Sequence, residues 1–239
     1  MPDPVDTDWL RHPGPRSIHG SVDAGGPSWL EAQVNHPVSD VDDSMVPLDT
    51  DPSLWTRIFI VAPLVVVGTQ EGEDHYDLAP KHMATPLGWT GLFGFSCNPA
   101  HGTYRNAREH GAFTVSYPRP DQVVVTSLTA TPRSSDDEAT PGLISLPTVP
   151  ARVVEGRVLR DARLVLECRL ERILDGLDES SFVIGRIVAA RARPEALRTT
   201  GIDDEEVLRR DPPLAFLAPD RYAAISRSHP FPFPAGFNR

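Results

Sequence analysis

A run of alternating apolar and charged residues between positions 151 and 192 constrains the fold of this chain most strongly. Three stretches carry it: ARVVEGRVLR at 151–160, RLVLECRLERIL at 163–174 and SFVIGRIVAARA at 181–192. Successive side chains of a strand point to opposite faces, so the middle stretch separates into two sets. Leu164, Leu166, Cys168 and Leu170 are expected on one face, and Val165, Glu167, Arg169 and Glu171 on the other. Long consecutive strands joined by short turns are typical of an antiparallel barrel.

The residues before this run predict further strands. IFIVAPLVVVG, at 58–68, is too short to span a bilayer and predicts two short buried strands. The second of them is expected at 64–69, where β-branched residues predominate. Strands are also expected at 91–97 and 112–118. The chain is therefore predicted to be mainly β.

Helices are expected to be short. Thr103 is a suitable N-cap and Gly111 a suitable stop for a helix between them. A second short helix is predicted at 203–210, capped by Asp203. Residues 119–132 fit either a strand or a helix capped by Asp121, and both interpretations stay open.

Composition divides the 239 residues into an arm and a domain. Residues 1–52 are rich in Pro, Gly, Asp and Ser, and predict an irregular acidic arm, with a disordered tail as the alternative. Residues 53–239 are expected to form one domain, with an exposed loop at 134–142 and an aromatic, proline-rich tail at 229–239. That tail is expected either to cover a site or to pack on a partner subunit.

Charge and cysteine usage exclude several classes of protein. The net charge of −10 argues against a nucleic-acid partner. No signal peptide or membrane span is predicted, and two cysteines make no disulfide framework, so a cytoplasmic protein is expected. The sequence holds no G-x-G-x-x-G, G-x-x-x-x-G-K-[ST], H-E-x-x-H or G-x-S-x-G motif, and its histidines lack metal-ligand spacing.

Two segments suit an anion. The first is APKHMAT, at 79–85, which is expected to be a loop and contains Lys81, the only lysine of the chain. The second is HGTYRN, at 101–106, which opens the helix predicted there; a helix N-terminus offers free N–H groups to a phosphate. Taken singly, Thr103 is also explained as a plain cap, and Lys81 and Arg105 as surface charges.

The sequence resembles the flavin reductase-like family of FMN-binding split barrels. The resemblance rests on LAPKHMATPLGWTGLFGFSCNPAHGTYRNAREHGAFTVSYP, SLTATPR, LPTVPARVVEGRVLRDARLVLECRLERI and LAFLAPDRYAAI, which together cover roughly residues 53–225. Thr103, Asn106, Gly111, Phe113 and Val115 match the family's T-x-x-N-[AI] helix and G-x-F-x-V strand. The resemblance implies an antiparallel split β-barrel with short helices, and a homodimer with flavin near the subunit interface.

The resemblance also implies that the two segments meet around an FMN. The residues expected beside the ring and ribityl chain are Ala79, Pro80, Lys81, His82, Met83, Ala84, Ser96, Cys97 and Asn98. Those expected at the phosphate and the turn before it are His101, Thr103, Arg105 and Asn106, with Lys81 as a further contributor. Cys97 and Cys168 are expected to be buried core residues rather than redox thiols.

The implied activity is an oxidoreductase in which NADH or NADPH passes hydride to FMN, as the reductase partner of a flavin monooxygenase or with another redox partner. The alternatives are an FMN-binding electron carrier that uses no nicotinamide and a barrel without flavin. No catalytic side chain is assigned. His82 and His101 are the candidate proton donors, and polar contact to phosphate or backbone is the simpler role for both.

Overall fold

The computed structural model describes residues 44–51, 54–130, 147–234 and 236. The chain divides into two units, Met1–Leu48 and Asp49–Arg239, and every helix and strand described below belongs to the second. The arm expected over 1–52 therefore lies largely outside the described residues, as does the loop expected over 134–142.

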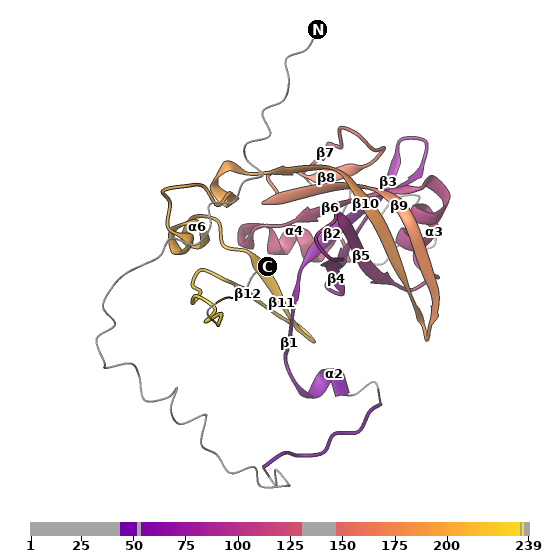
Figure 1. Ribbon diagram of the computed structural model, residues 1–239. Coiled ribbons are helices and arrows are strands. Elements are labelled where there is room, and N and C mark those ends of the chain that lie inside the picture. Colours follow the sequence, from indigo (N-terminus) through magenta and orange to yellow (C-terminus); the bar gives the residue numbers. More distant parts are fainter. Residues whose placement is uncertain (1–43, 52–53, 131–146, 235, 237–239) are drawn as a thin grey trace, which may run out of the picture. The chain divides into compact units, whose positions relative to one another are not determined.

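A seven-stranded antiparallel sheet forms the body of the second unit (Figure 1). In spatial order its strands are β3 (His75–Lys81), β2 (Val65–Gly72), β6 (Ala112–Tyr117), β9 (Leu164–Leu177), β10 (Ser180–Ala192), β5 (Leu92–Cys97) and β4 (Ala84–Pro86). The pairing of β9 with β10 shifts register at three places, and such bulges bend a strand. The sheet accordingly curls into a half-barrel (Figure 1).

Two smaller antiparallel sheets complete the β structure of the described residues. One contains β1 (Ile60–Pro63), β11 (Leu214–Ala218) and β12 (Arg221–Ala224), and the other contains β7 (Thr148–Pro150) and β8 (Arg157–Leu159). The helices are α2 (Leu54–Arg57), α3 (Gly102–His110), α4 (Val123–Leu128) and α6 (Asp204–Arg210), with 3₁₀ turns at Pro120–Gln122 and Pro194–Ala196. In the part of the chain described, no helix is long and apolar enough to cross a membrane. The expected mainly β antiparallel fold with short helices is confirmed.

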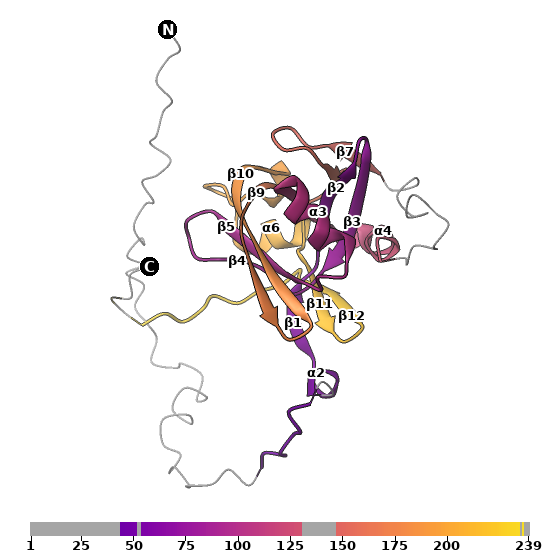
Figure 2. The same ribbon diagram turned by 90° about the vertical axis from the view of Figure 1, so that its right-hand side faces the viewer.

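Both faces of the sheet around β2 are covered. Val65 and Val67 belong to one core cluster, which also contains Tyr104 and Ala107 of α3. Val66 belongs to a second cluster with residues of β8 and β9 on the opposite face. Figure 2 shows α3 beside β2 and β3. This arrangement explains why 65–67 is a continuous valine run rather than an alternating one.

Gly68 allows the second layer to lie close to β2. A Cβ atom built at this position would come within 2.5 Å of the Arg157 carbonyl oxygen and 2.6 Å of Thr114 Oγ1. Thr114 Oγ1 donates to the same Arg157 carbonyl at 2.6 Å. The glycine therefore permits a close approach of β8 that a side chain would prevent.

Several expectations about elements were wrong. The segment 79–85 is not a loop, because β3 includes Ala79–Lys81 and β4 begins at Ala84. The first strand predicted within 58–68 is not buried, since β1 pairs only with β11 and the Val61 side chain is 67% exposed. The ambiguous stretch 119–132 contains a 3₁₀ turn and α4 as far as Leu128, and Asp121 is not the cap of α4.

The strand expected over 151–160 is also wrong in its first half. Only Arg157–Leu159 pairs as a strand, and residues 152–154 turn so that their backbone N–H groups donate to the Glu167 carboxylate. Glu167, which was assigned to the charged face of its strand, is 1% exposed. The predicted helix at 203–210 forms as α6, and the Asp203 side chain accepts from the Glu205 N–H as expected of a cap.

Candidate functional site

The end of β3 presents alternate residues to the two faces of the sheet. Asp77, Ala79 and Lys81 lie opposite Thr69, Val67 and Val65 of β2. Residues directly opposite each other in an antiparallel pair share a face, so these three lie on the same side as α3. Leu78 and Pro80 lie on the other side, where Leu78 is in the second core cluster. The segment expected to border one ligand is thus divided between two faces.

The first turn of α3 meets β3 through Asp77. His101 is the N-cap of the helix, and its side chain makes no capping hydrogen bond. Thr103 was expected to be the N-cap, and this expectation was wrong. The Thr103 side chain is 1% exposed, and its hydroxyl donates to Asp77 Oδ2 at 2.9 Å. A Cβ atom on Gly102 would lie 3.7 Å from the same oxygen. The two anion-friendly segments therefore meet, with a carboxylate between them.

Arg105 places its guanidinium at the start of the same helix. Its side chain is exposed and Nη1 donates back to the Ala100 carbonyl oxygen, one residue before the N-cap. This bond keeps a delocalised positive charge beside the first turn of α3 and leaves further N–H donors available. Asn106, in contrast, is 6% exposed and donates to Thr69 Oγ1 at 3.3 Å. Asn106 fixes the helix to β2 and is not presented to solvent.

Lys81 reaches the end of β5, where Cys97 lies. Burial raises the pKa of the Cys97 thiol, and the nearby Lys81 ammonium and the Tyr104 N–H, which hydrogen-bond it, offset part of that increase. The thiol is 3% exposed, so it is a protonated core residue at neutral pH. Lys81, Cys97 and the first turn of α3 are thereby brought to one place on the α3 face.

The turn after β5 is fixed by Asn98. Its side-chain Oδ1 accepts from the Ala100 N–H at 2.8 Å, and its carbonyl accepts from the His101 N–H at 3.0 Å. These bonds satisfy the polar groups of the turn and direct the chain into α3. Asn98 therefore sets where His101 and the helix N-terminus lie.

The remaining predicted residues lie along the connection from β3 to β4. The His82 ring packs against the Phe216 ring of β11, with a centroid separation of 4.8 Å. Burial, and then the charge of Lys81, lower the pKa of His82, so its ring is neutral at pH 7. Met83 is 59% exposed, and its carbonyl accepts from the Ser96 N–H at 2.8 Å, whereas Ala84 is buried in the core.

This donor set fits a phosphate group on a flavin. The Lys81 ammonium and the Tyr104 N–H of α3 both lie beside Cys97, and the Arg105 guanidinium lies at the start of the same helix. Cationic side chains beside a helix N-terminus are the chemistry that binds phosphate in proteins. The Thr103 hydroxyl is committed to Asp77 and is not a free donor. The groups that would hold a phosphate here are therefore the Lys81 ammonium, the Arg105 guanidinium and the N–H groups after His101, and not the Thr103 hydroxyl.

Asp77 is the functional neighbour that the sequence reasoning missed. In HYDLAPK, at 75–81, Asp77 and Lys81 are four residues apart, so they share a face of any strand formed there. That spacing could have revealed the pair, but the segment was interpreted as a turn and a loop, for which no common face exists.

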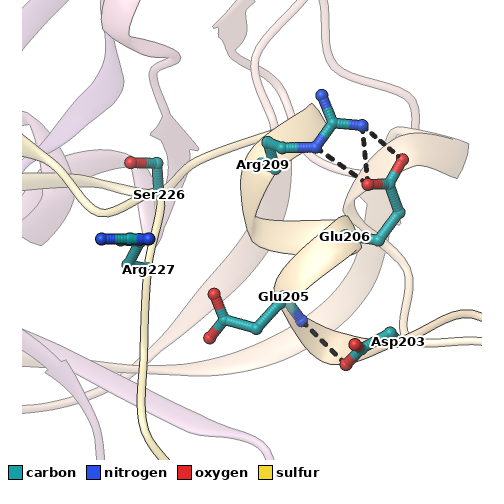
Figure 3. Close-up of a pocket in the computed structure, with 6 residues that line it drawn as sticks. All are labelled: Asp203, Glu205, Glu206, Arg209, Ser226 and Arg227. Carbon is teal, nitrogen blue, oxygen red and sulfur yellow. Dashed lines mark hydrogen bonds and ion pairs between the residues drawn. The ribbon is translucent and has the colours of Figure 1, made fainter.

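A separate pocket of about 440 Å³ lies between α6 and residues 226–227 (Figure 3). Its carboxylates already accept hydrogen bonds, and Asp203 accepts from the Glu205 N–H. Glu206 accepts from Arg209, and Glu205 accepts from the Ser228 N–H at 2.8 Å and hydroxyl at 2.9 Å. These contacts attach Ser228, the residue before the aromatic tail, to α6, and we assign the pocket a structural role.

Comparison with known families and proteins gives consistent results. The family model described as "Flavin reductase like domain" matches residues 57–225. An uncharacterized protein from Halalkalibacterium halodurans is 30% identical over 128 residues. That match covers 50% of this chain and only 57% of the relative, so the chain spans little more than half of the curated relative's length.

Solved structures share the fold. Nitrilotriacetate monooxygenase component B from Bacillus cereus is 22% identical with a TM-score of 0.66, covering 80% of this chain and 100% of that one. The NADH:FAD oxidoreductase of Streptomyces globisporus is 14% identical with a TM-score of 0.60, covering 75% of this chain and 97% of that one. At these identities the likeness establishes the fold alone.

Proposed function

Because the chain belongs to the flavin reductase-like domain family, we propose that it binds FMN and acts as an oxidoreductase that receives hydride from NADH or NADPH. The observation that carries this proposal is the placement of two cations, Lys81 beside Cys97 and Arg105 beside Ala100, at the first turn of α3. When bound, the flavin supplies the hydride chemistry. The protein needs only to bind and orient it and to exclude competing reactions.

The side chains divide this work between them. Lys81 and Arg105 hold the phosphate, and the N–H groups after His101 complete its shell. The backbone around Lys81, His82 and Met83, together with Ser96, Cys97 and Asn98, borders the ring and ribityl chain. Because the pKa of His82 is lowered by burial, its imidazole does not act as a cationic proton donor at neutral pH. His82 instead holds the connection from β3 to β4 against Phe216.

Two further parts of the proposal concern partners. The similarity to component B of a nitrilotriacetate monooxygenase supports a reductase that serves an oxygenase. We also propose a homodimer. It is supported by four exposed apolar side chains in α2, in β1 and in the residues between them. These are Trp55 at 56%, Ile58 at 47%, Phe59 at 60% and Val61 at 67% exposed.

A comparison of FMN with riboflavin tests the phosphate site. Riboflavin carries the same ring and ribityl chain without the phosphate. We expect Lys81→Met and Arg105→Gln each to weaken FMN binding about tenfold, the effect of losing a hydrogen bond to a charged group. Riboflavin affinity should stay unchanged, and quenching of flavin fluorescence on titration measures both. Arg108→Gln is the matched control, because Arg108 is exposed on the same helix and donates to the Tyr104 hydroxyl instead.

Two results would contradict the assignment. Equal loss of FMN and riboflavin affinity in the Lys81 and Arg105 variants would mean that these residues act through the fold. Unchanged FMN affinity in both variants would mean that the phosphate does not bind at the first turn of α3.

A further inference from the structure

A second cavity lies on the face of β3 opposite to Lys81. It has a volume of about 510 Å³ and lies between α4, the end of β3 and the β11–β12 hairpin. Its walls are mostly apolar and are formed by Leu64, Pro80, Val123, Val124, Phe216 and Tyr222. Concave sites of this size and character suit small organic ligands with one to three rings.

Thr126 lies in the wall of this cavity, and its side-chain hydroxyl has no hydrogen-bond partner. It is 1% exposed, and its Oγ1 atom makes no hydrogen bond in the structure. The neighbouring hydroxyls of the same segment are satisfied: Ser127 Oγ donates to the Val124 carbonyl at 2.8 Å, and Thr129 Oγ1 to the Thr126 carbonyl at 2.7 Å. A buried hydroxyl without a partner is unfavourable, and a ligand oxygen that reached Thr126 Oγ1 from the cavity would supply the missing hydrogen bond.

The remaining features narrow the chemical class of that ligand. Phe216 and Tyr222 offer aromatic surfaces for a flat molecule. Asp220 and Arg221 are adjacent, exposed and opposite in charge, so their fields largely cancel and favour neither an anion nor a cation. We propose that this cavity is a binding site for a neutral, planar aromatic molecule that carries one hydrogen-bonding oxygen.

The site adjoins the candidate flavin site without depending on it. Pro80 lines the cavity, while its sequence neighbour Lys81 lies on the α3 face. Phe216 lines the cavity and also contacts the His82 ring. A molecule held there would lie next to the segment that we assign to the flavin, and its binding can be measured in protein free of flavin.

Calorimetric titration of the flavin-free chain with 2-naphthol tests the proposal. We expect saturable binding with one site per chain. Thr126→Val keeps the shape of the side chain and removes the hydroxyl, and should weaken binding about fivefold, as expected for one neutral hydrogen bond. Thr126→Ser restores the hydroxyl and should bind within about twofold of the original protein.

A variant that fills the cavity distinguishes binding in the cavity from binding elsewhere on α4. Val124→Trp places a large ring in the cavity and should abolish 2-naphthol binding, whereas Leu128→Trp, on the same helix but outside the cavity lining, should not. 2-Naphthoate should bind no more tightly than 2-naphthol. Absence of binding to the original protein, equal binding by Thr126→Val, or tighter binding of the naphthoate would overturn the proposal. Competition between FMN and 2-naphthol would also overturn it, because the cavity would then belong to the flavin site.

Discussion

Glu167 is the residue whose surroundings say most about the stability of this fold. Its carboxylate accepts from the Val153 N–H at 2.6 Å, from the Val154 N–H at 3.1 Å and from Arg191 Nη1 at 2.9 Å. It also accepts from the Arg152 N–H, at 3.0 Å to one oxygen and 3.1 Å to the other. Burial alone would raise the pKa of Glu167, but these backbone donors and Arg191 outweigh it and lower the pKa.

The lowered pKa makes a specific prediction about pH. A carboxyl whose folded-state pKa lies below its unfolded value adds stability above the unfolded pKa, which is near 4.5, and loses it as the pH falls through the folded pKa. Glu167→Gln should therefore lower the free energy of unfolding by about 3 kcal/mol at pH 7, because it leaves buried N–H groups and Arg191 poorly satisfied. Urea unfolding at a series of pH values from 7 down to about 3 should show this difference in unfolding free energy narrowing as the pH falls below the unfolded pKa.

Glu171→Gln on the same strand is the matched control. Glu171 pairs with Arg186 at 3.1 Å, but both side chains are nearly half exposed. An exposed ion pair contributes about 0.5 kcal/mol, so this substitution should have little effect at any pH in that range. Similar losses in both variants would show that the buried carboxylate has no special role.

The sequence predicted the role of a single residue only where its nearest neighbours in the chain determine that role. Gly111 ends α3 with a positive φ of 67°, and Asp203 caps α6, as their types and positions indicate. Threonine is a residue type that often caps helices, but the N-cap of α3 is His101. The Thr103 hydroxyl instead donates to Asp77 of β3. A partner 26 residues away is set by tertiary packing, which no local pattern contains.

At the level of elements, the sequence pattern predicted the long strands and also β2, β5 and β6, but it did not predict β3 and β4. β9 and β10 were expected because their alternation persists over many residues. Residues 151–156 have the same alternation, yet they form a turn because a buried carboxylate binds their N–H groups. The run VVVTSL of α4 has high strand propensity but forms a helix, because tertiary context overrides a weak preference of this kind.

The order of elements explains why the candidate site could be predicted only in part. β3 and β5 lie near opposite edges of the seven-stranded sheet. The two-residue connection from β3 to β4 and the pairing of β4 with β5 across the curled sheet bring Lys81 to Cys97. The resemblance to a known family predicted that these segments meet. It did not predict that Pro80 and Lys81 would face opposite sides of β3, since this follows from the register with β2.

At the level of the whole molecule, the proposed homodimer makes a testable prediction. Sedimentation equilibrium should give twice the chain mass of 26.2 kDa. Val61→Asp places a charge among the exposed apolar residues of α2 and β1 and should yield single chains. Val188→Asp, on the partly exposed strand β10, should leave the dimer intact. A single-chain mass for the original protein would contradict the proposal.

The most direct test of the central claim is a visible absorption spectrum of the chain after incubation with FMN and removal of the unbound flavin. The spectrum is recorded before and after anaerobic addition of NADH and, separately, of NADPH. Our account predicts that flavin absorption stays with the protein and is bleached by one of the two donors. Protein without bound flavin would contradict the assigned site. Bound flavin that neither donor reduces would contradict the proposed activity and favour an electron carrier instead.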